Sequence, residues 1–425
     1  MNNSRMIMKK AVCTTLLALV SLLVHGQVQP TTALLGGWSG KLDVGGASLT
    51  LVLHLEQADG YVEATLDSPD QGATGIGAYK EFLSDDSLSL KVEAIGMTYR
   101  ARLKDDKLVG TFSQNGFSIP LVLSKGIPEV KRPQTPQPPF PYKTEEVTFR
   151  NEADGATLSG TLTWPIRLMG HSGSSKPTVV LLVTGSGQQN RDEELLSHKP
   201  FLVIADYLAY RGIATLRYDD RATNASVGGD VKNATTEDFM RDASAGLDYL
   251  RSRNEFGKIG ILGHSEGGSI AFMLGAQGKT DFIVSLAGPG VKGDTLLAAQ
   301  SNRILTLSGQ TADMTVEKYR QQEAVQQMPW IKWFVDYDPS EDIRQTRCPV
   351  FALNGERDCQ VISSQNLEAI QRLLPSSEKN LIKEYPALNH LFQHCTTGLV
   401  TEYGQIEETI APEVLNDIAE WLRGL

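Results

Sequence analysis

The segment 259–268 constrains the fold of this chain more than any other part of the sequence. It reads Ile259-Gly260-Ile261-Leu262-Gly263-His264-Ser265-Glu266-Gly267-Gly268, an apolar run that leads directly into a stretch able to form a helix. A serine at such a strand-to-helix turn has strained backbone angles, and only small residues fit two positions before and after it. We therefore predict a buried strand, a tight turn and a helix, with the Ser265 hydroxyl projecting from the sheet.

Ser265 at this turn is predicted to be a nucleophile; a purely structural turn is the alternative. The helix that follows would offer free N–H groups and the positive end of its dipole, which suit a developing oxyanion. We expect the Glu266 N–H to be one donor. The second is expected from the Gly-rich stretch 183–188, with the Ser186 N–H as first choice and Gly187 next. That stretch lacks the third glycine of a nucleotide-binding loop.

The partners of a nucleophilic serine at such a turn follow it in the order acid, then histidine. Two histidines lie downstream, His390 and His394, and we predict His390 as the general base because it follows the last candidate strand. The spacing of His390 and His394 could also suit a metal ion, but no further ligands accompany the two histidines, so no metal is expected. The acid should lie on the loop after the preceding strand. We predict Asp358 there, with Glu356 as the alternative.

Around these residues, apolar runs rich in β-branched side chains alternate with helical segments. We expect strands at 178–183, 213–218, 259–263, 282–286, 350–354 and 380–384, and an antiparallel opening pair at 146–149 and 157–162. We expect helices at 200–211, 236–253, 267–278, 363–374 and 412–423. Continuous apolar strands separated by helices predict an α/β fold whose mostly parallel sheet is covered on both faces.

The alternation of strands and helices stops between about 291 and 345, where we predict a helical insertion. Within it, Trp330, Trp333, Phe334 and Tyr337 share one helical face. We predict that the insertion is a lid and that Trp330, Trp333 and Phe334 line an apolar substrate pocket. The alternative is that these aromatic side chains only pack the insertion against the body.

The chain before this region has a different pattern. Between about 34 and 124, short alternating runs are separated by turn residues, which predicts an all-β barrel or sandwich. Six prolines between 126 and 142 predict an extended linker. The expected domains are therefore a leader at 1–26, an all-β domain at 27–125, a linker at 126–143 and a catalytic domain at 144–425.

The first 26 residues have the composition of a secretory signal peptide. Arg5, Lys9 and Lys10 precede an apolar stretch at 11–24, and small or apolar residues stand before Gln27. The stretch is too short to span a hydrocarbon core of about 30 Å, although an uncleaved anchor is the alternative. We expect export to the periplasm or the medium, with no stable membrane insertion after cleavage.

The charge and the cysteines limit the partners. The 425 residues include 40 Lys and Arg against 50 Asp and Glu, a net charge of −10 that gives no basic face for nucleic acid. After cleavage, Cys348, Cys359 and Cys395 remain. Cys359 and Cys395 lie near the predicted acid and base. They could form a disulfide with each other or remain free buried thiols, and the sequence leaves both alternatives open.

Four segments carry a resemblance to the α/β-hydrolase superfamily over about 145–425, namely 185–192, 218–221, 263–268 and 389–392. More narrowly they resemble a group of exported bacterial carboxylesterases that is often placed beside serine aminopeptidases, with Ala222 where such enzymes usually have Gly. The all-β domain also resembles one found ahead of such esterases. The resemblance implies an esterase acting on short or medium acyl chains without a cofactor, with Ser265, Asp358 and His390 as its triad.

Two other functions remain open from the sequence. A serine peptidase could use the same triad, with Glu266, Glu356 or Arg191 holding the substrate terminus. A ligand-binding protein could use the β domain and keep an inactive hydrolase body as a scaffold.

Overall fold

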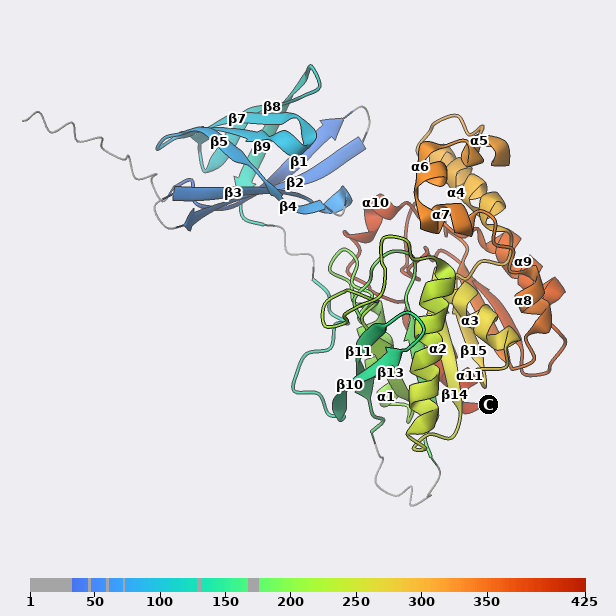
Figure 1. Ribbon diagram of the computed structural model, residues 1–425. Coiled ribbons are helices and arrows are strands. Elements are labelled where there is room, and N and C mark those ends of the chain that lie inside the picture. The colour runs from blue at the N-terminus through green and yellow to red at the C-terminus, as the bar shows by residue number, and fades with distance from the viewer. Residues whose placement is uncertain (1–32, 45–46, 59–60, 72, 128–130, 167–175) are drawn as a thin grey trace, which may run out of the picture.

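The computed structural model describes residues 33–44, 47–58, 61–71, 73–127, 131–166 and 176–425. The predicted signal peptide at 1–26 lies outside them. The described residues form two units joined by a connection without helix or strand (Figure 1). No helix in this part of the chain is long and apolar enough to cross a membrane.

The N-terminal unit is a meander of antiparallel strands that nearly closes on itself, which confirms the predicted all-β domain. Each strand except β4 pairs with the next along the chain, and β1 also pairs with β9. The two edge strands of the sheet, β4 and β5, do not pair with each other. They are consecutive in the chain, and Ala78 alone separates them. The strands are β1 (Gly36–Val44), β2 (Ala47–Ala58), β3 (Tyr61–Ser68), β4 (Ala73–Gly77), β5 (Tyr79–Leu83), β6 (Ser87–Val92), β7 (Met97–Lys104), β8 (Lys107–Gln114) and β9 (Phe117–Lys125).

Apolar side chains fill the inside of this barrel because alternate residues of each strand point inward. The polar atoms that enter it are paired: Trp38 Nε1 donates to the Leu34 carbonyl, and the Tyr99 hydroxyl lies 3.0 Å from the Leu108 carbonyl. The cavity left between the side chains measures about 10 Å³. That is room for about one water molecule, so the interior is a packed core.

The C-terminal unit is an eight-stranded sheet with helices on both faces, which confirms the predicted α/β fold. The order along the sheet is β10-β11-β13-β12-β14-β15-β16-β17, and all pairs from β13 to β17 are parallel. The strands are β10 (Thr144–Asn151), β11 (Ala156–Thr163), β12 (Val179–Val183), β13 (Ala214–Tyr218), β14 (Ile259–His264), β15 (Ile283–Leu286), β16 (Val350–Gly355) and β17 (Leu381–Tyr385).

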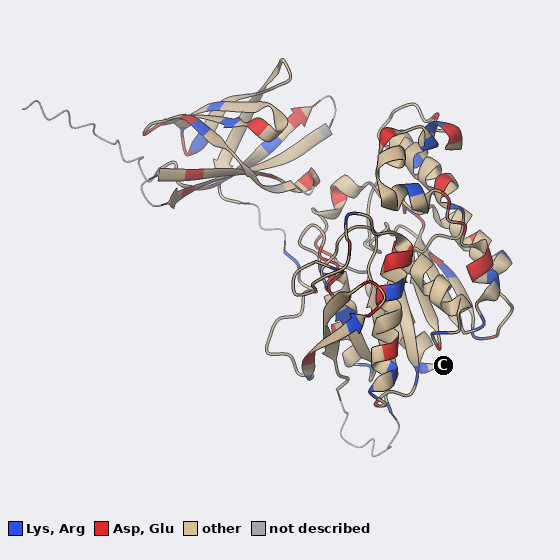
Figure 2. Cartoon of the chain, in the orientation of Figure 1, with Lys and Arg blue, Asp and Glu red and all other residues tan. Residues whose placement is uncertain are grey.

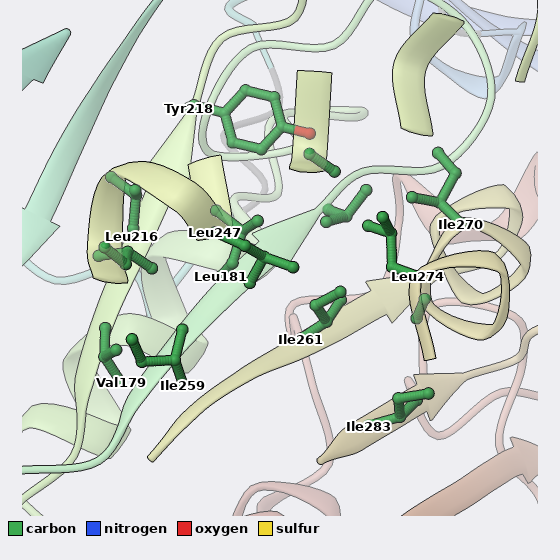
Figure 3. Packing of buried hydrophobic residues seen from close by; sticks show 14 of the residues in the cluster. Val179, Leu181, Leu216, Tyr218, Leu247, Ile259, Ile261, Ile270, Leu274 and Ile283 are labelled. Carbon is green, nitrogen blue, oxygen red and sulfur yellow. The ribbon is translucent and has the colours of Figure 1, made fainter. Parts of the chain in front are cut away.

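Two apolar clusters lie on the two faces of this sheet. On one face, α2 (Thr236–Ser252), α3 (Glu266–Ala276) and α9 (Ser363–Leu373) cover the strands. Figure 3 shows Leu247 of α2 and Leu274 of α3 beside Leu181 and Ile261 of the central strands. On the other face lie α1 (Pro200–Ala209) and α11 (Pro412–Arg423). Buried helices on both faces explain why the central strands are apolar without alternation.

The insertion at 291–345 is helical, as predicted, and contains no strand. It has its own apolar cluster, which includes Leu296, Val325 and Phe334. Its helices are α4 (Gly293–Leu307), α5 (Val316–Arg320), α6 (Glu323–Gln327), α7 (Pro329–Phe334) and α8 (Ser340–Gln345). Acidic and basic residues are interspersed along the chain in both units (Figure 2).

The connection between the units is fastened to the C-terminal unit. Arg132 donates to the carbonyls of Leu196, Gly404 and Ile406 at 2.7–3.0 Å. A short helix, α10 (Val400–Tyr403), precedes the segment that Arg132 binds. Just beyond α10, Gln405 donates to Asp70 of the barrel at 2.7 Å. The proline-rich stretch is therefore anchored to the C-terminal unit through Arg132.

Candidate active site

Ser265 lies on the turn between β14 and α3 with φ 53° and ψ −117°. Such angles are costly for a residue with a side chain and persist only where the surroundings enforce them. The glycines two residues before and after Ser265 show how closely the surrounding backbone packs against this turn. A Cβ on Gly263 would lie 2.0 Å from the Gly267 carbonyl oxygen, and one on Gly267 would lie 2.2 Å from that of Val183. Ser265 is partly exposed, whereas its neighbours are buried.

Asp358 and His390 lie on the loops after β16 and β17. His390 Nδ1 is 2.7 Å from Asp358 Oδ2, and their side chains are 5 % and 0 % exposed. The other carboxylate oxygen of Asp358 accepts the N–H groups of Gln360 and Val361. Parallel strands end at the same edge of a sheet, so these loops reach the turn that carries Ser265. His264, the residue before Ser265, contacts the His390 carbonyl at 3.0 Å.

The alternative acid and the second histidine face elsewhere. Glu356 is exposed and accepts the Ala387 N–H at 2.9 Å. His394 is half-exposed and contacts Glu408 and Glu413 at 2.9 and 3.2 Å. In the described part of the chain, no group of three or more His, Cys, Asp or Glu side chains is arranged to hold a metal ion.

The Gly-rich loop after β12 lies against the nucleophile turn. A Cβ on Gly185 would lie 3.3 Å from the Ser265 Cβ. The Gly185 N–H is already engaged, since it donates to Glu193 at 2.8 Å. The N–H groups of Ser186 and Gly187 have no protein acceptor among the described residues. Both therefore remain available to a ligand.

The insertion reaches the nucleophile turn through Trp330. Trp330 Nε1 donates to the Glu266 carboxylate at 2.8 Å. Burial raises the pKa of this carboxyl, which is 3 % exposed. Trp330 stacks on Phe334 at 5.2 Å, and Phe334 is itself buried in the insertion. Trp333 stacks on Tyr337 instead. The structure therefore brings Trp330 to the site, with Phe334 behind it.

The three cysteines of the described residues are free. The Cys395 thiol faces the Ala387 carbonyl at 3.4 Å. Burial raises the pKa of Cys359 to about 12 and that of Cys395 to about 11, so both thiols stay protonated near neutral pH. Of the two arrangements left open by the sequence, the structure has the free thiols.

Sequence reasoning missed a buried pair behind the nucleophile turn. His264 Nδ1 lies 2.9 Å from Glu193 Oε1, and both residues are buried. Glu193 belongs to the loop between β12 and α1, and no spacing in the sequence connects it with His264. Its positive φ of 50° could not be read from the residue type either, since glutamate rarely adopts it.

The eight-stranded sheet, the serine turn after β14 and the acid and histidine loops after β16 and β17 define an α/β-hydrolase fold. A family model described as "Serine aminopeptidase, S33" matches residues 198–394, which include the turn and both loops.

The chain is similar to Esterase EstD of Thermotoga maritima, with 28 % identity over 283 residues. The match covers 62 % of this chain and 65 % of EstD, less than two thirds of that relative. Among solved structures it is similar to the esterase Pf2001 of Pyrococcus furiosus, with 16 % identity, 67 % of this chain, 90 % of that chain and a TM-score of 0.42. Est1E of Butyrivibrio proteoclasticus, solved with ferulic acid, has 18 % identity, 64 % and 99 % coverage and a TM-score of 0.43.

Proposed function

We propose that this protein is an exported serine carboxylesterase that acts on small esters with short or medium acyl chains. The observation that carries the proposal is the buried His390–Asp358 contact of 2.7 Å at the same sheet edge as Ser265, which sits on a strained turn. The similarity to Esterase EstD supports ester hydrolysis. The basic and apolar leader at 1–26 supports export.

In the proposed reaction, Ser265 Oγ attacks the ester carbonyl while His390 takes its proton. Asp358 holds the His390 Nδ1–H and stabilises the imidazolium. The N–H groups of Glu266 and Ser186 bind the oxyanion. His390 then protonates the leaving alcohol, and an acyl-enzyme remains. Water, deprotonated by His390, attacks this acyl group and restores the free serine.

Ester hydrolysis is favoured over exopeptidase activity by what the candidate clamps for a peptide terminus already bind. The Glu266 carboxylate accepts from Trp330, and Glu356 accepts from the Ala387 N–H. Arg191 pairs with Asp219 at 2.7 Å. Each group is thus engaged within the chain. A binding role for the β domain has no support from its interior, which side chains fill.

The insertion is proposed to act as a lid over the acyl chain. Trp330 is the side chain that would meet the acyl group first, since it reaches the residue next to Ser265. Phe334 would support its indole ring from behind, and Trp333 would extend the apolar face.

The test is an assay of the chain from residue 27 onward on p-nitrophenyl esters of graded acyl length and on aminoacyl p-nitroanilides. Ser265→Ala should abolish ester turnover and labelling by a fluorophosphonate. Ser252→Ala, an exposed serine at the end of α2, is the matched control and should behave as wild type. Turnover of the anilides alone would indicate a peptidase. A folded protein with no turnover and no labelling would refute the proposal.

A further inference from the structure

A buried carboxylate and a buried imidazole lie behind the nucleophile turn and take no part in the proposed reaction. Glu193 and His264 are 5 % and 6 % exposed. Glu193 Oε1 accepts the Gly185 N–H at 2.8 Å and lies 2.9 Å from His264 Nδ1. His264 Nε2 lies 3.0 Å from the carbonyl oxygen of His390. One chain of contacts thus runs from the Gly-rich loop through the turn to the histidine loop.

The positions of the protons in this series of contacts follow from its donors and acceptors. A carbonyl oxygen only accepts, so His264 Nε2 carries a hydrogen. His264 Nδ1 faces a carboxylate oxygen, which is also an acceptor. Both contacts are satisfied when His264 is an imidazolium, with a proton on each nitrogen, and Glu193 is ionised. The pair is then neutral as a whole, which is what burial requires of charged groups.

We propose that Glu193 and His264 are positioning residues. Through a buried imidazolium–carboxylate pair they hold the Gly-rich loop, the nucleophile turn and the histidine loop in a fixed arrangement. The inference rests on the proposed function, because these three parts need a fixed arrangement only if they act on one substrate. Neither residue touches the substrate. Both act through the backbone of Gly185, Ser265 and His390.

The electrostatics around His264 agree with this proton arrangement. Burial by itself lowers the pKa of the imidazole, but the Glu193 carboxylate and the other groups that raise it together outweigh burial, and the net pKa is raised. The His390 carbonyl and the Asp358 carboxylate act in the same direction. The His390 ring itself lies 4.7 Å from the His264 ring, centroid to centroid.

The backbone of the loop shows what the pair must hold in place. Glu193 has a φ of 50°, and Leu196 and Ser197 that follow have φ values of 52° and 65°. Three non-glycine residues in left-handed conformations store strain in one short loop. The Glu193 side chain, anchored to Gly185 and His264, keeps this loop against the nucleophile turn.

The kinetic test uses Glu193→Ala and Glu193→Gln in the complete exported chain, assayed on a short p-nitrophenyl ester. We expect kcat to fall at least about tenfold in Glu193→Ala with KM changed less than about threefold, because the loops lose alignment and not substrate contacts. Glu193→Gln should recover part of kcat, since its amide oxygen can still accept the Gly185 N–H. The control is Glu194→Ala, the exposed neighbour, which should match wild type. A kcat in Glu193→Ala equal to that of the control would overturn the proposal.

A second measurement does not depend on ester turnover. In ¹⁵N-histidine-labelled protein, we expect both ring N–H protons of His264 as protected downfield signals that His264→Gln removes. In Glu193→Gln one of the two should disappear, because the neutral imidazole keeps a single N–H. A wild-type His264 with one N–H would overturn the ion pair. Both signals together with no ester turnover would instead refute the proposed esterase and leave the pair standing.

Discussion

The barrel and the α/β unit bury different kinds of side chain. In the barrel the buried residues are almost all apolar; Ser68, Asp70 and Ser89 are the polar ones in its described part. The α/β unit buries many charged side chains among its apolar core. Those charged residues are Glu193, Arg217, Asp219, Asp220, Arg221, Asp242, Glu266, Asp294 and Asp358.

The difference separates stability from chemistry. A buried charge costs free energy unless partners compensate it, and replacing such pairs by apolar groups is often neutral or stabilising. Most of the buried charges of the α/β unit lie in paired networks, such as Arg221 with Asp242 at 2.7 Å and His390 with Asp358. Asp220 and Glu266 instead accept hydrogen bonds from uncharged donors. Several of the buried charges surround Ser265, whereas the barrel has no comparable cluster in its described residues. The catalytic role is therefore expected in the α/β unit alone.

The largest expected effect comes from exchanging one buried aspartate in each unit for asparagine. Asp358→Asn should lower kcat about 10³- to 10⁴-fold, because an amide does not hold the base tautomer that accepts the Ser265 proton. Asp70→Asn removes a barrel carboxylate that accepts the Thr50 N–H and the Gln405 amide, and should leave kcat within about threefold of wild type. Equal losses of kcat in the two variants would contradict the division between the units.

A large-to-small substitution in the core of each unit tests whether the units unfold separately. Trp38, 0 % exposed in the barrel, and Phe282, 0 % exposed in the α/β unit, are matched in burial. Each change to Ala should cost its own unit about 3–5 kcal/mol. Calorimetry should find a lower barrel transition in Trp38→Ala with ester turnover retained at 25 °C. Phe282→Ala should lower the other transition. A single transition shifted by both variants would refute separate unfolding.

A buried histidine should give the α/β unit a pH dependence that the barrel lacks. Burial lowers the pKa of His198 to about 4, against 6.5 in the unfolded chain. Between these values the unfolded chain binds a proton that the folded chain does not. The free energy of unfolding should therefore fall as the pH drops from about 6.5 to about 4, by up to roughly 3 kcal/mol.

The His198 contribution is isolated by comparing wild type with His198→Gln, since carboxylates titrate in the same range. For the α/β transition, the difference in the free energy of unfolding between the two proteins should depend on pH. It should be constant for the barrel, whose described histidine, His54, is not buried. A pH-independent difference in the α/β transition would contradict the assignment.

The smallest expected effect concerns the connection between the units. Arg132→Ala leaves the carbonyls of Leu196, Gly404 and Ile406 without their donor, which should cost about 1–3 kcal/mol. Because residues beyond Gly404 also bind the histidine loop, through Glu408 and Gln393, ester turnover should decline faster on heating. Lys131→Ala, an exposed neighbour, is the control. Identical inactivation rates of the two variants would show that the anchor does not stabilise the site.

Much of the fold could be predicted because its signals are local. The strand at 259–263 and the helix at 236–253 were expected within one or two residues of β14 and α2, since apolar periodicity and breaks mark their ends. The turn at Ser265 could be predicted for the same reason, as Gly263 and Gly267 stand beside it. The roles of Ser265, Asp358 and His390 in catalysis stay predictions until the variants are assayed.

The residues around the site could not be predicted in the same way. The contact between Trp330 and Glu266 joins positions 64 residues apart, and the Glu193–His264 pair joins positions 71 apart. The aromatic face of the insertion was visible, but which ring would reach the nucleophile turn depends on how the helices pack. Arg132 stands in a proline-rich stretch that predicts only an extended linker.

By itself, the sequence determined where the chain changes from barrel to α/β sheet and where the sheet can carry a nucleophile. Both follow from side-chain periodicity and from the steric needs of a few glycines, which act between near neighbours. Only the tertiary structure decided that the His390 and Asp358 loops meet, that Glu193 is buried beside His264, and that Trp330 covers Glu266. Those contacts depend on the order of strands in the sheet and on the packing of its helices, which bring together residues far apart in the chain.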